Sequence, residues 1–366
     1  MGDKSQIEWT QATWNPLAGC TKVSPGCKNC YAIRDAHRMS GNPNEKIHAK
    51  YAGTVTEDGR NWTSKINFDE SSLALPLRWT RPRRIFVNSM SDLFHANVPD
   101  EWIDKIFAVM ALAPQHTFQV LTKRPERMRE YLGQKAAEWT DLGVSETLKE
   151  MGIDCDYCYN QGKVKPHLKA AGWYFDWDPA GEGGELIYDG MTPFPHIWLG
   201  VSVENQEEAD ARIPLLLDTP AAVRWLSCEP LLEIVDLNNY LYTRFEMGGA
   251  RNNHNKVDWV VAGGESGPKA RPSHPDWYRS LRDQCQAAGV PFFFKQWGEY
   301  QPVTPLYAGR DDAAENGRGE LISLDTDGFI WDKWQPNDLR TWLIEKVGKK
   351  HAGRELDGRT WDEMPK

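Results

Sequence analysis

Three cysteines near the amino terminus are the residues whose types and spacing most directly suggest chemistry. Cys20, Cys27 and Cys30 follow the spacing C-x6-C-x2-C, in a loop that also contains Gly19 and Gly26. Three thiolates are one fewer than a closed four-coordinate zinc site needs. They fit a cubane iron–sulfur cluster in which one iron is left open for a substrate. From the spacing alone, a cluster and a zinc site completed by a distant His or Cys remain equal alternatives.

The elements that must position this loop are short apolar runs that alternate with helical patterns. Runs begin near residues 85, 118, 197, 223, 258 and 291. Such an alternation indicates a parallel sheet covered on both faces. All steps but one have the length of a βα unit, and the long step after residue 118 implies an insertion at roughly residues 140–195. With a further strand just before Cys20, the pattern predicts a full or partial (β/α) barrel, and an open doubly wound sheet is the alternative.

The expected boundaries follow from these runs. The barrel is expected over residues 1–300, and residues 301–366 are expected to form a hairpin, a helix and a tail. The expected strands are 84–87, 118–121, 197–201, 223–226, 259–262 and 291–294. The expected helices are 31–39, 100–112, 125–135, 205–217, 274–288 and 337–349. A hairpin is expected to turn at residues 325–328, and the tail over 353–364 either docks Trp361 or is disordered.

Polar residues follow each of these apolar runs. In (β/α) barrels the reactive residues lie at the carboxyl ends of the strands. The residues at those positions are Asp92, Lys123, Glu204, Glu229, Glu265 and Lys295. We therefore expect these side chains to share one end of the sheet with the cysteine loop.

Composition limits the class of protein. The chain has 366 residues, a net charge of −9 and seven cysteines, which is not a secreted disulfide framework. It contains no apolar run of about 18 residues that would span a bilayer, so a cytoplasmic location without a membrane partner is expected. The charge argues against general nucleic-acid coating, but residues 78–84 leave room for a local basic groove. Cys155 and Cys158 form half of a zinc site, a reduced surface pair, or a lid feature without metal.

The motifs WNPLAGC, CKNCYA, NSMSDLF, LTKRP, GVSVEN, WLSCEPL, GGESG and LDGRTWDEMP extend the analysis over nearly the whole chain. With them the chain resembles a family of uncharacterised phage and prophage proteins with a three-cysteine motif. That family is similar to the radical S-adenosylmethionine (SAM) superfamily, and most closely to spore photoproduct lyase. The resemblance implies a barrel of the radical SAM type and a 4Fe–4S cluster held by Cys20, Cys27 and Cys30. The open iron would bind SAM, and reduction would yield methionine and a 5′-deoxyadenosyl radical.

The resemblance also suggests which residues hold the cofactor. Ser89 and Asp92 would contact the amino group or ribose of SAM, and Lys123 its carboxylate. Ser202 and Glu204 would hold the ribose hydroxyls, although Glu204 also suits the first turn of the following helix.

On the substrate side, Glu229, Glu265 and Lys295 would line the site. Cys228 would return a hydrogen atom to a product radical, unless it is a buried inert cysteine.

The expected partners are a nucleic acid or nucleotide substrate, for repair or modification, and an electron donor such as flavodoxin or ferredoxin. The expected setting is the cytoplasm of a bacterium or of a phage-infected host. The alternative from another class is a non-catalytic binding module of phage origin, stabilised by zinc or by a cluster.

Overall fold

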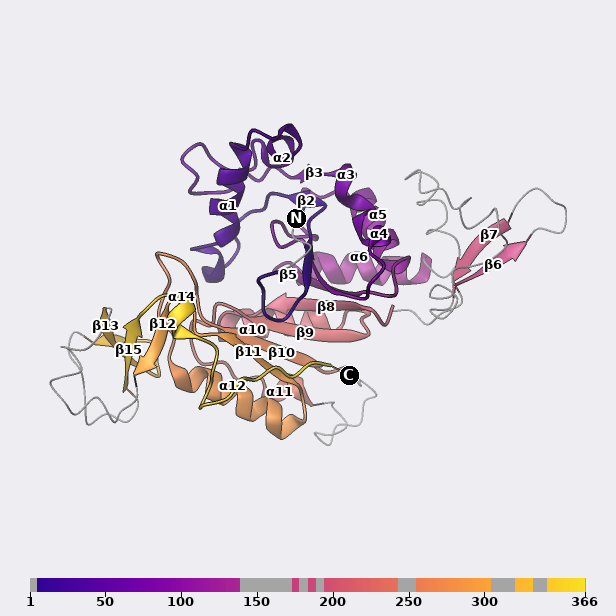
Figure 1. The fold of residues 1–366 in the computed structure, drawn as a ribbon. Helices are drawn as coiled ribbons and strands as arrows, with labels where there is room; N and C mark the ends of the chain where they lie inside the picture. Colours follow the sequence, from indigo (N-terminus) through magenta and orange to yellow (C-terminus); the bar gives the residue numbers. More distant parts are fainter. Residues whose placement is uncertain are drawn as a thin grey trace. The chain divides into compact units, whose positions relative to one another are not determined.

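The computed structural model describes residues 5–138, 173–177, 184–188, 194–242, 255–303, 320–331 and 341–365 (Figure 1). Contacts divide the chain into two compact units. The first comprises Met1–Thr21, Ala32–Gly200 and Asp218–Val223. The second comprises Lys22–Tyr31, Val201–Leu217 and Arg224–Lys366. The cysteine loop therefore contributes Cys20 to the first unit and both Cys27 and Cys30 to the second.

Parallel strands form the centre of the first unit. β1 (Ala12–Trp14) pairs with β4 (Arg84–Val87), which pairs with β5 (Thr117–Thr122). The β-branched and aromatic residues of β4 favour a strand and are buried. The helices α5 (Asp100–Ala111) and α6 (Pro125–Glu138) follow β4 and β5. α6 begins with a proline, which suits a first helical position because no amide hydrogen is needed there.

Shorter elements complete the first unit around the cysteine loop. They are β2 (Leu17–Ala18), α1 (Tyr31–Ser40), α2 (Glu45–Tyr51), β3 (Asn67–Phe68), α3 (Glu70–Leu73) and α4 (Leu75–Arg78). β2 and β3 pair in antiparallel fashion. The helix expected over 31–39 is confirmed by α1.

The second unit also contains parallel strands. β8 (Ile197–Ser202) crosses from the first unit into the second, followed by β9 (Val223–Cys228), β10 (Trp259–Gly263) and β11 (Phe292–Gln296). β9, β10 and β11 pair in parallel. The intervening helices are α10 (Gln206–Leu217), α11 (Asn238–Leu241) and α12 (Pro275–Ala288). α12 ends at Gly289, whose φ of 65° is the left-handed conformation expected after a helix.

The hydrogen-bonded order of the seven strands follows the chain: β1-β4-β5-β8-β9-β10-β11. A doubly wound sheet reverses its order at a switch point, and this series of strands contains no reversal. The protein is therefore a mixed α/β protein with a sequentially ordered parallel sheet, which is compatible with a partial (β/α) barrel.

The C-terminal part forms a separate antiparallel sheet in the order β12-β15-β13-β14. Its strands are β12 (Tyr300–Val303), β13 (Leu321–Asp325), β14 (Ile330–Trp331) and β15 (Thr341–Lys346). The expected hairpin is confirmed by β13 and β14, but the helix expected over 337–349 is wrong where β15 lies. β15 pairs with both β12 and β13 and buries Leu343 and Ile344, and these tertiary contacts outweigh the local helix signal.

The C-terminal tail docks on the second unit. After α14 (Lys349–Ala352), the Trp361 side chain is 9% exposed and its carbonyl accepts a hydrogen bond from the Phe294 amide. The guanidinium of Arg282 lies 5.4 Å from the Trp361 ring centroid. Of the two expectations for the tail, docking is the one observed.

The expected insertion lies mostly outside the described residues, as do Cys155 and Cys158. Within it, β6 (Trp173–Trp177) and β7 (Gly184–Tyr188) form an antiparallel pair. In the described part of the chain, no helix combines the length and the apolar character needed to cross a membrane.

Candidate cysteine-loop site

The local backbone of the cysteine loop depends on its glycines and prolines. Gly19 has a φ of +104°, and a Cβ there would lie 2.1 Å from the Lys65 carbonyl oxygen, so only glycine fits. A short 3-10 turn, η1 (Pro25–Cys27), directs the chain toward Cys30. Cys20, Cys27 and Cys30 are all half-buried and none is in a disulfide.

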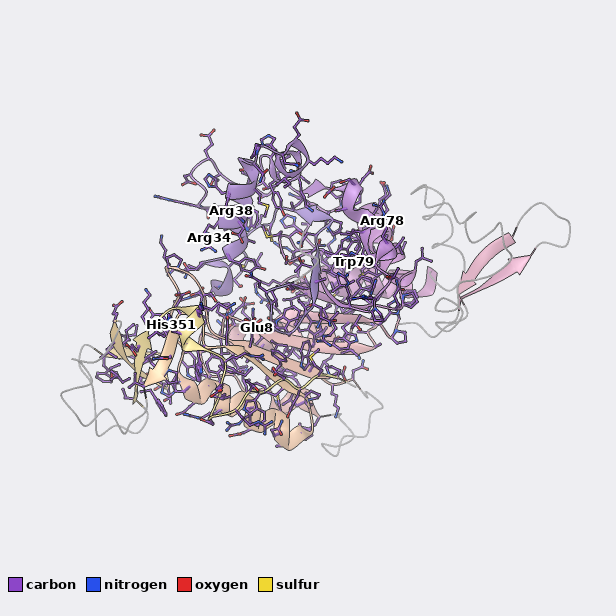
Figure 2. The ribbon with its side chains drawn as sticks, in the orientation of Figure 1. Glu8, Arg34, Arg38, Arg78, Trp79 and His351 are labelled. Atoms are coloured by element: carbon purple, nitrogen blue, oxygen red, sulfur yellow. The ribbon has the colours of Figure 1, made fainter. Side chains whose placement is uncertain are left out.

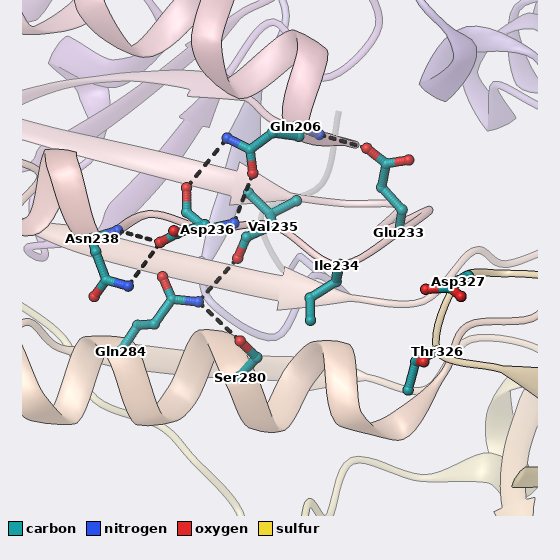
Figure 3. Close-up of a pocket in the computed structure, with 10 residues that line it drawn as sticks. All are labelled: Gln206, Glu233, Ile234, Val235, Asp236, Asn238, Ser280, Gln284, Thr326 and Asp327. Atoms are coloured by element: carbon teal, nitrogen blue, oxygen red, sulfur yellow. Dashed lines mark hydrogen bonds between the residues drawn. The ribbon is translucent and has the colours of Figure 1, made fainter. Parts of the chain in front are cut away.

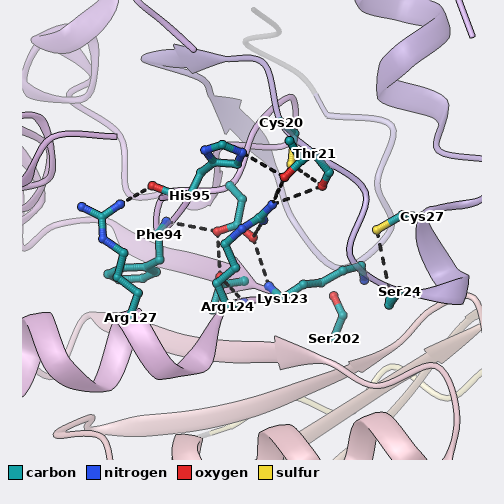
Figure 4. Close-up of polar contacts among 12 residues, drawn as sticks. Cys20, Thr21, Ser24, Cys27, Phe94, His95, Lys123, Arg124, Arg127 and Ser202 are labelled. Atoms are coloured by element: carbon teal, nitrogen blue, oxygen red, sulfur yellow. Dashed lines mark hydrogen bonds and ion pairs between the residues drawn. The ribbon is translucent and has the colours of Figure 1, made fainter. Parts of the chain in front are cut away.

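In the first unit, a buried ion pair holds the start of the loop (Figure 4). Arg124, just after β5, donates from Nη1 to Asp92 Oδ2 at 2.7 Å. Its Nη2 donates to the Thr21 hydroxyl at 2.6 Å and to the Thr21 carbonyl at 3.2 Å. The same guanidinium lies 3.8 Å from Cys20 Sγ. A cation beside a thiol favours the thiolate, which is the form that binds metals.

Asp92 is fully engaged in this arrangement. Besides Arg124, its carboxylate accepts hydrogen bonds from the Thr122 hydroxyl at 2.7 Å, the Lys123 amide at 3.1 Å and the Phe94 amide at 3.0 Å. Only 6% of Asp92 is exposed. In this structure Asp92 therefore positions Arg124 and connects the segments that follow β4 and β5. Its expected contact with SAM stays a prediction.

His95 adds a further contact to Thr21, with 3.0 Å between Nε2 and the hydroxyl. Burial, and then the positive charge of Arg124, lower the pKa of His95 from 6.5 to about 4. The imidazole is thus neutral near pH 7. Ser89, the other residue expected near SAM on this strand end, donates to the Asn15 side chain at 3.1 Å.

In the second unit, Glu204 contacts the loop at the start of η1. Its side chain is fully buried, accepts a hydrogen bond from the Ser24 hydroxyl at 2.9 Å and pairs with Arg212 at 2.9 Å. A Cβ on Gly26 would lie 2.2 Å from Glu204 Oε1, so the glycine is what permits this close approach. Glu204 precedes α10, which begins at Gln206, and Arg212 also donates to the Ser202 carbonyl at 2.8 Å.

Glu265, at the end of β10, holds the loop from another side. Both of its oxygens accept hydrogen bonds from the Arg271 guanidinium, at 2.7 and 2.8 Å, and Oε2 also accepts from Asn29 at 3.1 Å. Arg271 donates further to the Pro25 carbonyl at 3.1 Å. Burial alone would raise the pKa of Glu265, but the hydrogen bonds from Arg271 and Asn29 outweigh it and lower that pKa.

A second polar pair lies near the ends of β9 and β11. Lys295 Nζ lies 3.3 Å from Glu229 Oε1, and the Ser227 hydroxyl lies 3.4 Å from Glu229 Oε2. A Cβ on Gly263 would lie 2.5 Å from Glu229 Oε1, so this glycine makes room for the carboxylate between β9 and β11. Glu229 and Lys295 are thus brought together as the sequence suggested.

Cys228 lies on the opposite face of β9 from Ser227 and Glu229, because side chains alternate along a strand. It is fully buried, and burial followed by the nearby Cys285 raises its pKa far above the ordinary value. Such burial is typical of an inert thiol, which was the alternative to a hydrogen-atom donor at Cys228.

Several residues of the site were not singled out from the sequence. They are Asn29, His95, Arg124, Arg212 and Arg271. Only Arg124 had a local signal, since it lies beside Lys123 in LTKRP. Asn29 and His95 act through partners that are distant in the sequence. Arg212 and Arg271 pair with carboxylates eight and six residues away, but no sequence pattern marks these pairs.

By type and number, the three thiols of the loop suit the ligands of a cubane cluster. Three half-buried cysteines lie within eleven residues, on a backbone fixed by buried polar contacts. Within the residues that the structure describes, no group of three or more His, Cys, Asp or Glu side chains is gathered as a metal site.

A cavity of about 610 Å³ lies in the second unit and is lined by none of the residues that contact the cysteine loop (Figure 3). It is lined by Gln206, Glu233, Ile234, Val235, Asp236, Asn238, Ser280, Gln284, Thr326 and Asp327. The cavity and the candidate site therefore share no lining residue.

Fold and site together define an α/β protein with a braced cysteine loop at the ends of parallel strands. A family model described as "Protein of unknown function (DUF5131)" matches residues 4–365, so the chain belongs to this family. No curated protein and no solved structure matches the chain.

Proposed function

We propose that this protein is a radical SAM enzyme whose 4Fe–4S cluster is held by Cys20, Cys27 and Cys30. The observation that carries the proposal is the bracing of the cysteine loop. Buried carboxylates from three strand ends hold the loop, directly or through arginines, while its thiols stay half-exposed. A loop built in this way keeps its cysteines in place for a ligand and does not rely on them as core residues.

When bound, the cluster would supply one-electron cleavage of SAM to methionine and a 5′-deoxyadenosyl radical. The protein residues have separate tasks. Asp92 holds Arg124 against Thr21 and Cys20, and this cation offsets the negative charge of thiolate ligands. We assign Lys123 and Ser89, on the ends of β5 and β4, to the carboxylate and amino groups of SAM.

On the second unit, Ser202 remains the candidate for the ribose, and Glu204 and Glu265 keep the loop in place. The Glu229–Lys295 pair is our candidate for substrate contact, because it places an anion and a cation 3.3 Å apart near the ends of β9 and β11. A half-buried ion pair of this kind can donate and accept hydrogen bonds to a polar substrate group.

The test is anaerobic reconstitution with iron and sulfide, followed by SAM and dithionite. We expect a brown protein that forms 5′-deoxyadenosine, and loss of both properties in Cys20→Ala, Cys27→Ala and Cys30→Ala. Cys285→Ala is the matched control, because this thiol is buried in α12. A colourless protein with one zinc per chain and no SAM cleavage would instead establish a non-catalytic metal-stabilised module.

A further inference from the structure

The first unit carries a short cationic segment, residues 78–84, with the sequence RWTRPRR. No Asp or Glu occurs anywhere from Ser71 to Ser91, although the whole chain has a net charge of −9. The segment is therefore a local concentration of positive charge in an acidic protein. Such a contrast orients a polyanion toward one part of a surface.

The backbone of the segment is fixed. α4 ends at Arg78, and the Trp79 amide donates to the Pro76 carbonyl at 3.2 Å. The Gln115 side chain donates to the Trp79 carbonyl at 3.3 Å, and the Thr117 amide donates to the Arg83 carbonyl at 2.9 Å. The segment thus presents its side chains from a defined position beside β5, and little chain entropy is lost when it binds a ligand.

Two of its arginines are available to an anion. Arg78 and Arg81 are exposed, and neither forms an ion pair with another residue that the structure describes. Arg34 and Arg38 on α1 are also exposed, but each lies 3.9 Å from the Asp35 carboxylate (Figure 2). The two pairs of arginines therefore have equal charge in different electrostatic surroundings.

An aromatic ring lies among these cations. The Arg83 guanidinium is centred 4.8 Å from the Trp79 ring, and the ring of His116 meets it edge-on at 6.0 Å. Trp79 is half-buried. Arginines interleaved with an aromatic ring combine phosphate pairing with base stacking, which is the chemistry of single-strand binding surfaces.

We infer that residues 78–84 bind single-stranded nucleic acid, with Arg78 and Arg81 on two phosphates and the exposed part of Trp79 against an unpaired base. A duplex keeps its bases stacked inside, so it would gain only the phosphate contacts. This surface does not depend on the cysteine loop or on the proposed reaction. It is therefore tested without SAM, reductant or activity.

The experiment is fluorescence anisotropy with the full chain and a labelled 20-nucleotide single strand, over a series of salt concentrations. Each phosphate contact to a single strand contributes about 0.7 to the slope of log K against log salt. For Arg78→Ala/Arg81→Ala we expect the slope to fall by about 1.4 and affinity at 0.1 M salt to fall about 25-fold. Arg34→Ala/Arg38→Ala removes the same charge and should change affinity far less.

Three results would overturn the inference. They are no saturable binding by the wild type, equal weakening by the two double variants, and tighter binding of a duplex or of anionic vesicles than of the single strand. Melting curves of both variants show whether folding is preserved. If Arg78→Ala/Arg81→Ala unfolds, Arg78→Gln/Arg81→Gln, which keeps the side-chain stems, takes its place in the comparison.

Discussion

Asp92 and Arg124 form an ion pair of 2.7 Å in which only 8% and 14% of their side chains are exposed. The pair joins the segment that follows β4 to the segment that follows β5. Because Arg124 also donates to the backbone and hydroxyl of Thr21, the pair connects the strand ends to the start of the cysteine loop. The position of the start of the loop thus depends on the folding of the strands that carry this pair.

Asp92→Asn should destabilise the protein strongly. The substitution leaves the Arg124 cation buried beside a neutral amide, and removal of one partner of a buried pair costs about 3–5 kcal/mol. Urea unfolding measures the change. Glu101→Gln is the control, since Glu101 is 67% exposed in its pair with Lys105 and such surface pairs contribute well under about 1 kcal/mol. Equal effects of the two substitutions would contradict the role given to Asp92.

Gly26→Ala should disturb the loop without affecting the strands. The added methyl group would lie 2.2 Å from Glu204 Oε1, so either η1 or the Glu204–Arg212 pair must shift. We expect a lower melting temperature and a lower iron content after reconstitution. Gly133→Ala in α6 is the matched control, because nothing lies within 4 Å of the new methyl and alanine favours a helix by up to about 1 kcal/mol. A normal iron content in Gly26→Ala would show that the contact is dispensable.

Much of the fold could be predicted because its strands are short, apolar and β-branched. Arg84–Val87 was expected and is β4, and Ile197–Val201 lies within β8. The helix expected over 337–349 fails for a different reason: β15 is stabilised by strands on both sides, which are distant in sequence. Local propensity does not report such pairing.

Glu265 should contribute to stability at neutral pH and lose that contribution in acid. Its folded pKa is lowered, so its contribution is present above the unfolded pKa near 4.5 and disappears as the pH falls through the folded pKa. Glu265→Gln should therefore melt lower than wild type at pH 7, and the difference should shrink as the pH falls below about 4.5. Melting temperatures across that range measure it. A difference independent of pH would mean that Glu265 acts through packing and not through its charge.

His95 should behave in the opposite way to Glu265, because its charged form should destabilise the folded protein. Its pKa falls from 6.5 to about 4 in the folded protein, so the unfolded chain binds a proton more readily between these values. The wild type should lose stability as the pH drops from 6.5 toward 4, and His95→Gln should lose less over the same interval. His351→Gln, on an exposed histidine, serves as the control. A His95 NMR titration near 6.5 would contradict the burial of its imidazole.

The candidate site was predictable only in part. The sequence placed Asp92, Glu204 and Glu265 at strand ends, where the structure has them. It could not show that arginines pair with these carboxylates, because the pairing depends on where the Arg124 and Arg271 side chains lie in the folded protein. A polar residue at a strand end can contact a ligand or support the loop that does, and only its partners distinguish the two.

The metal content of the anaerobically reconstituted protein tests the central claim most directly. Iron and sulfide should each approach about four per chain in the wild type, as a cubane cluster requires. Each of Cys20→Ala, Cys27→Ala and Cys30→Ala should lose the cluster, while Cys155→Ala and Cys158→Ala should keep it. One zinc per chain in place of iron, or an iron content that depends on Cys155 or Cys158, would contradict the assignment of these three cysteines as cluster ligands.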